Sequence, residues 1–143
     1  MLNRRLFTVA LVLLTLTSPD GAALAEPVPS PKVVFVIVDG IPADVIERVP
    51  TPAIDAIAAA GGYGRATVGG PIGEPGETPT ISAPGYMNLI TGTWANKHNV
   101  YKNYGISPDY RYWNLFRLAR SEKPELRLGI FSTWTDNRTI LLG

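Results

Sequence analysis

Residues 33–40 read VVFVIVDG, and residues 82–92, further along the chain, read SAPGYMNLITG. The first stretch is apolar at every position up to Asp39-Gly40, which predicts a strand covered on both faces, as in a parallel sheet. The second stretch predicts a helix that starts at Ser82 or Ala83, because proline suits the first helical turn and Gly92 is a stop signal. The two stretches together indicate an α/β protein.

The rest of the chain repeats this alternation of strands and helices. Strands are predicted at 33–38, 63–68 and 127–134, and further helices are predicted from Thr51-Pro52 to Gly61 and over 109–121. Such alternation predicts a three-layer α/β sandwich with a mainly parallel sheet. We assign residues 33–143 to this domain and residues 26–32, which are rich in proline, to a linker.

The first 25 residues have the pattern of a cleavable signal peptide. Arg4 and Arg5 precede an apolar run over residues 6–16, and Ala23-Leu24-Ala25 is a small-residue cleavage pattern. A membrane anchor is the alternative, but the run is short for a membrane span. We therefore expect cleavage after Ala25, a periplasmic or secreted protein, and no stable membrane anchor afterwards.

The amino-acid composition excludes some kinds of catalytic chemistry and of binding partner. The chain has no cysteine, so neither a disulfide framework nor a thiolate nucleophile is expected. Its 13 basic and 12 acidic side chains nearly balance, and they form no basic stripe. Duplex nucleic acid is therefore not an expected partner.

Three residues are candidates for chemistry, and each also has an ordinary structural interpretation. Asp39 follows a strand, where it can hold a hard cation or belong to an Asp-Gly turn. Ser82 begins a helix, where its hydroxyl can attack a phosphate bound at the helix N-terminus or act as a cap. Asn103 can hydrogen-bond a substrate oxygen or lie in a turn. His98 and a divalent metal ion are the two open routes for activating Ser82.

The motifs taken in order resemble the alkaline phosphatase superfamily, and most closely its type I phosphodiesterase/nucleotide pyrophosphatase branch. The matching stretches are residues 33–40 (VVFVIVDG), 51–61 (TPAIDAIAAAG), 82–92 (SAPGYMNLITG), 97–103 (KHNVYKN) and 112–134. Serine stands where that branch usually has threonine, and Gly85 stands where it often has asparagine.

The resemblance implies a hydrolase of phosphodiesters or phosphate esters that works through a covalent phosphoseryl intermediate. It implies Ser82 as nucleophile and metal ligand, Asp39 as metal ligand, and Asn103 as the holder of a substrate phosphate oxygen. It also implies two divalent metal ions, usually zinc in the family, and a small phosphate ester or nucleotide as substrate. Because the chain has one histidine, we expect it to be the N-terminal part of a longer enzyme, incomplete at the C-terminus and inactive alone.

Two other interpretations stay open. A sulfatase-like or phosphomonoesterase activity is the alternative within the same superfamily, although residues 82–85 lack the ending of the C-x-P-S-R sulfatase motif. The alternative from another class is a non-catalytic exported α/β fragment, or a module that binds an anion at the start of the helix that begins at Ser82.

Overall fold

The computed structural model of this chain describes residues 31–143, so the predicted signal peptide and most of the predicted linker lie outside the described residues. The chain divides into two units, residues 1–35 and residues 36–143. The described part of the first unit, residues 31–35, is exposed and carries no helix or strand. The domain boundaries therefore stay predictions, and everything below concerns the second unit.

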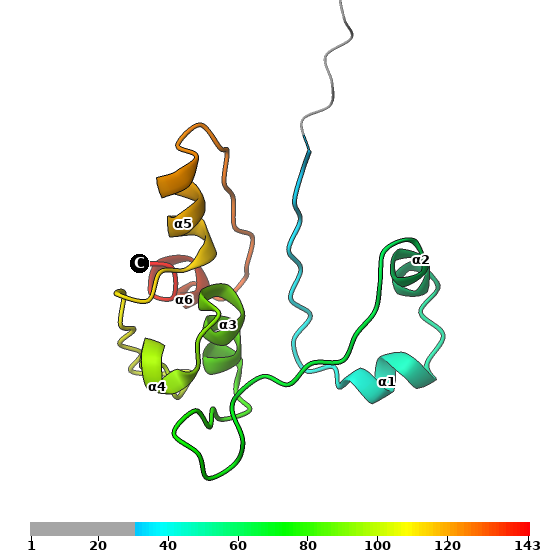
Figure 1. Cartoon of the computed structure of the whole chain (residues 1–143), viewed down its shortest axis with the longest axis horizontal. Helices are drawn as coiled ribbons and strands as arrows, with labels where there is room; N and C mark the ends of the chain where they lie inside the picture. The colour runs from blue at the N-terminus through cyan, green and yellow to red at the C-terminus, as the bar shows by residue number, and fades with distance from the viewer. Residues whose placement is uncertain (1–30) are drawn as a thin grey trace, which may run out of the picture. The chain divides into compact units, whose positions relative to one another are not determined.

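The second unit contains the helices labelled in Figure 1. In chain order they are α1 (Ala43–Arg48), α2 (Pro52–Ala60), α3 (Ser82–Thr91), α4 (Ala95–His98), α5 (Leu115–Glu122) and α6 (Asp136–Thr139). Of these, α3 and α4 pack against each other. No helix within residues 31–143 has the length and apolar character that crossing a membrane requires.

The predicted helices α2 and α3 are confirmed with almost the expected ends. Helix α2 begins after Thr51, whose hydroxyl donates to Asp55 Oδ1 at 2.9 Å and whose N–H donates to Oδ2 at 3.3 Å. Helix α3 runs from Ser82 to Thr91 and ends at Gly92. Gly92 has a φ of 66°, a left-handed conformation that glycine adopts without steric cost.

Helix α5 starts later than the sequence pattern predicts. The prediction that this helix begins at residue 109 is wrong, because the Asp109 side chain accepts the N–H of Arg111 at 3.1 Å and forms a local turn. Asn114 then caps the helix by accepting the N–H of Arg117 at 2.9 Å. The short helices α1, α4 and α6 were not predicted.

The described residues contain one isolated parallel bridge, between Gly70 and Glu77, and no longer strand pairing. The sequence predicts strands at residues 33–38, 63–68 and 127–134, and in the structure these segments form neither helix nor strand. The three-layer sandwich and its parallel sheet therefore stay predictions.

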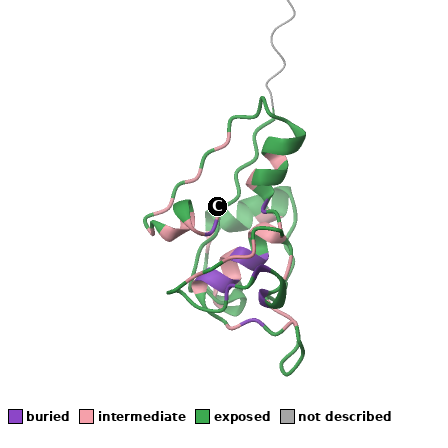
Figure 2. Ribbon diagram, turned by 90° about the vertical axis from the view of Figure 1, so that its left-hand side faces the viewer, coloured by how far each residue is buried: buried purple, intermediate pink, exposed green. Residues whose placement is uncertain are grey.

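The hydrophobic core of the second unit is built around α3. Ala83, Met87, Val100 and Leu141 form a buried cluster, and partly buried residues pack against it (Figure 2). These partly buried residues are Tyr86, Ile90, Ile106 and Trp134. Because the cluster joins α3 to residues from the C-terminal part of the chain, it holds the first turn of α3 in place, and that turn carries Ser82.

Candidate functional site

Ser82 is the first residue of α3, and its hydroxyl does not cap the helix. The N-cap position belongs to Ile81, which has no side-chain cap. The Ser82 hydroxyl instead donates to Asp39 Oδ2, with 2.7 Å between the two oxygens. The structural interpretation of Ser82 as an N-cap is therefore wrong.

Asp39 is an exposed carboxylate that receives two hydroxyl groups on one oxygen. Oδ2 accepts from Ser82 at 2.7 Å and from Tyr86 at 2.8 Å. The hydrogen bond from Ser82, and then that from Tyr86, lowers the pKa of Asp39 below its ordinary value. Asp39 is consequently charged at neutral pH, and the next residue, Gly40, makes the turn with a φ of 76°.

The Asn103 side chain contacts the N-terminal end of α3, although it lies 20 residues after Ala83 in the sequence. Its Oδ1 accepts the N–H of Ala83 at 2.8 Å, so its amide nitrogen remains the group that can donate to a ligand. Pro84 has no N–H, and no described residue accepts the N–H of Ser82. The start of α3 therefore presents a hydroxyl, a backbone donor and a side-chain amide together.

His98 lies elsewhere, in the interior. The side chain is fully buried, Nδ1 accepts the N–H of Val100 at 3.1 Å, and Nε2 lies 2.7 Å from the side-chain amide of Asn88. Burial lowers the pKa of His98 to about 4. Both ring nitrogens are engaged, and neither contacts Ser82, so the structure does not assemble the histidine route of activation.

Sequence analysis missed Tyr86. This residue lies four positions after Ser82 and hence on the same face of α3, which is the signal that could have drawn attention to it. Burial, and then the hydrogen bond to Asp39, raises the pKa of Tyr86, so the phenol keeps its proton and donates.

The oxygen atoms of Asp39 and Ser82 suit a divalent cation. A charged, exposed carboxylate and a hydroxyl 2.7 Å from it are oxygen donors of the kind that such ions bind. Within residues 31–143 there is no group of three or more histidine, cysteine, aspartate or glutamate side chains arranged to hold a metal ion. Asp39 and Ser82 therefore offer two oxygen donors, and a metal ion held by them stays a proposal.

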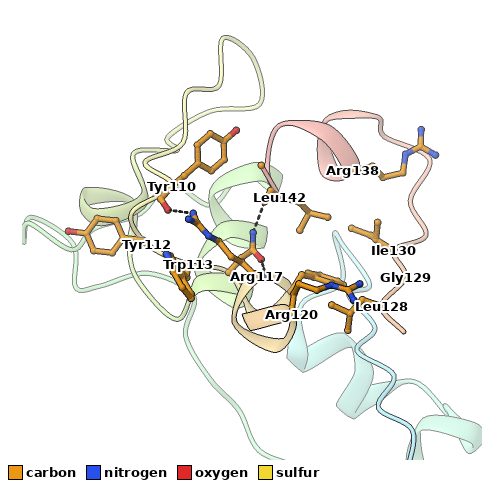
Figure 3. A pocket seen from close by; sticks show the side chains of 13 residues that line it. Tyr110, Tyr112, Trp113, Arg117, Arg120, Leu128, Gly129, Ile130, Arg138 and Leu142 are labelled. Carbon is orange, nitrogen blue, oxygen red and sulfur yellow. Dashed lines mark hydrogen bonds between the residues drawn. The ribbon is translucent and has the colours of Figure 1, made fainter. Parts of the chain in front are cut away.

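A hollow of about 680 Å³ lies between α5 and the C-terminal segment (Figure 3). Arg117 lies 4.7 Å from the centre of the Trp113 ring and donates to the carbonyl oxygen of Tyr110 at 3.0 Å. Asn114 donates to the carbonyl oxygen of Leu142 at 2.8 Å. None of the predicted site residues Asp39, Ser82 and Asn103 lines this hollow.

Comparison with known families places the chain among phosphoester hydrolases. The family whose model matches is described as type I phosphodiesterase / nucleotide pyrophosphatase, and the match covers residues 33–141. The chain belongs to this family, so the resemblance drawn from its motifs is confirmed. Comparisons with curated proteins and with solved structures found no match.

Proposed function

We propose that the full-length protein is an exported, metal-dependent hydrolase of phosphodiesters or related phosphate esters, with Ser82 as the nucleophile. The observation that carries the proposal is the meeting of Asp39, Ser82 and Asn103 at the start of α3. Asp39 comes from 43 residues before Ser82 and Asn103 from 20 residues after Ala83, so neighbourhood in the sequence does not explain the cluster. Membership of a family of phosphoester hydrolases supports the same conclusion.

The geometry suggests how these residues act on the substrate. The hydroxyl proton of Ser82 points to Asp39 Oδ2, which leaves the lone pairs of Oγ free to attack phosphorus. As Oγ forms a bond to phosphorus it gives up its proton to water, the bond to the leaving oxygen breaks, and that oxygen takes a proton from water to leave as an alcohol. Water later hydrolyses the phosphoserine. The Ser82 N–H, the Asn103 amide nitrogen and the positive end of α3 stabilise the non-bridging oxygens.

Asp39 and Ser82 are also the residues that would hold divalent metal ions, for which we propose zinc. The chemistry such ions supply when bound is neutralisation of charge on the phosphoryl oxygens and a lower pKa for the attacking hydroxyl. Asp39 contributes a carboxylate that is already charged at neutral pH, because two hydrogen bonds lower its pKa. The substrate is proposed to be a small phosphate ester or a nucleotide.

The test is Ser82→Ala in the full-length protein. We expect turnover of bis(p-nitrophenyl) phosphate to be abolished while the far-ultraviolet circular dichroism stays unchanged, because the hydroxyl caps no helix. Ser121→Ala, which changes an exposed serine of α5, is the matched control and should keep full activity. Unchanged turnover in Ser82→Ala would sink the assignment of the nucleophile. Faster turnover of a phosphomonoester or a sulfate ester by the wild type would favour the rival activities.

A further inference from the structure

Tyr86 and Ser82 hold the same carboxylate oxygen from the same face of α3. The two residues are one helical turn apart, and their hydroxyls donate to Asp39 Oδ2 at 2.8 Å and 2.7 Å. Within the described residues these are the side-chain hydrogen bonds that Asp39 makes, and neither uses Oδ1. Both side chains therefore hold Asp39 through Oδ2, and Oδ1 accepts no hydrogen bond from another described side chain.

The phenol of Tyr86 is itself held by packing. Its ring lies 6.4 Å from the ring of Trp134, tilted by 58°, and both rings pack against the buried cluster around Met87. A tilted aromatic pair at this separation is a favourable arrangement. The ring thus has a fixed place in the core, and its hydroxyl extends from that place to Asp39 at the surface.

Asp39 has little other support. The three residues before it, 36–38, are exposed, and helix α1, which follows it, has no buried residue. An exposed carboxylate on such a segment has many rotamers, and a ligand site needs one of them. The contact with Tyr86 connects this segment to the core of α3 across 47 residues of sequence.

We propose that Tyr86 is a positioning residue that holds the Asp39 carboxylate in the orientation that binds a divalent cation through Oδ1. The inference rests on the proposed function, in which Asp39 is a metal ligand. Ring packing against Trp134 does not use the hydroxyl, which donates to Asp39 Oδ2. Hydrogen-bond partners of ligating carboxylates typically affect metal affinity or activity by about 10- to 100-fold.

The test is Tyr86→Phe in the full-length, metal-stripped protein, titrated with Zn²⁺ by calorimetry. The variant keeps the ring against Trp134 and loses only the hydroxyl. We expect Zn²⁺ to bind about 10-fold more weakly. We also expect kcat for bis(p-nitrophenyl) phosphate to fall while KM stays nearly constant. Tyr110→Phe is the matched control, because it removes a hydroxyl that donates to the carbonyl of Ile140 at 2.7 Å without touching Asp39.

The outcomes separate this inference from the proposed function. If Asp39→Ala binds Zn²⁺ as tightly as the wild type, both the metal role of Asp39 and the role of Tyr86 are overturned. If Asp39→Ala weakens Zn²⁺ binding and Tyr86→Phe does not, only the positioning role fails. Equal weakening in Tyr86→Phe and Tyr110→Phe would mean a general loss of stability, and it would also overturn the inference.

Discussion

The burial of His98 predicts a specific loss of stability in mild acid. The folded protein keeps the imidazole neutral, because burial lowers its pKa to about 4 from the ordinary value of 6.5. The unfolded chain exposes the ring and takes up a proton at the ordinary pKa. Protonation therefore favours the unfolded state, so the contribution of His98 to stability is complete above pH 6.5 and is lost as the pH falls toward 4.

The size of the effect follows from the two pKa values. One pKa unit corresponds to about 1.4 kcal/mol. At pH 5 the unfolded chain is about 1.5 units below its imidazole pKa of 6.5 and is therefore mostly protonated. The folded protein, whose imidazole pKa is about 4, is almost unprotonated at the same pH. We expect the free energy of unfolding to fall by about 2 kcal/mol between pH 7 and pH 5 through His98 alone.

Urea unfolding at pH 7 and pH 5 measures this loss. The chain has a single histidine, so the difference between the wild type and His98→Gln isolates it from the carboxylates. Lys97→Gln, a change at the exposed neighbouring residue, should show the same pH dependence as the wild type. If His98→Gln does not fold, NMR titration of the His98 imidazole gives its pKa directly. A pKa near 6.5 in the folded protein, or an equal pH dependence in His98→Gln, would refute the reasoning.

Two further predictions concern helix ends, and both are measured as the free energy of unfolding in urea. Asn114→Ala loses the cap of α5 and the hydrogen bond to the Leu142 carbonyl, so it should cost about 2 kcal/mol. Asn114→Ser loses only the hydrogen bond to Leu142 and keeps a capping oxygen, so it should cost about 1 kcal/mol. Equal losses of stability in the two variants would contradict the assignment of about half of the cost to the cap. Gly92→Ala should cost about 1 kcal/mol, because φ is 66° while nothing lies within 4 Å of the added methyl group. Asn tolerates that conformation, so Gly92→Asn should cost less, and the reverse order would contradict the explanation.

Some features of the fold could be predicted because their causes are local. Proline in the first turn and glycine after the last turn mark α2 and α3 within a few residues of each end. The start of α5 was predicted wrongly because the apolar spacing was given more weight than local turn and cap signals. The turn at Asp109 and the cap at Asn114 both favour a later start, yet the apolar spacing continues through them.

In the candidate site, too, residue types could be predicted from the sequence, but their contacts could not. The residue types at Asp39, Ser82 and Asn103 could be recognised from motifs, and the family match bears out the resemblance that those motifs carry. Their meeting could not be derived from spacing, because it depends on how segments 20 to 43 residues apart fold together. Tyr86 was overlooked for this reason, since its hydroxyl has a partner only once Asp39 reaches α3.

The sequence by itself determined the family, the ends of α2 and α3, and the presence of a hydroxyl at the start of a helix. Only the tertiary structure decided that Ser82 donates to Asp39 and does not cap α3, that Tyr86 shares this carboxylate, and that His98 is a buried residue. The physical reason is the distance along the chain over which each interaction acts. Helix start and stop signals act on backbone groups within one turn, whereas burial and hydrogen-bond partners depend on distant segments that pack together.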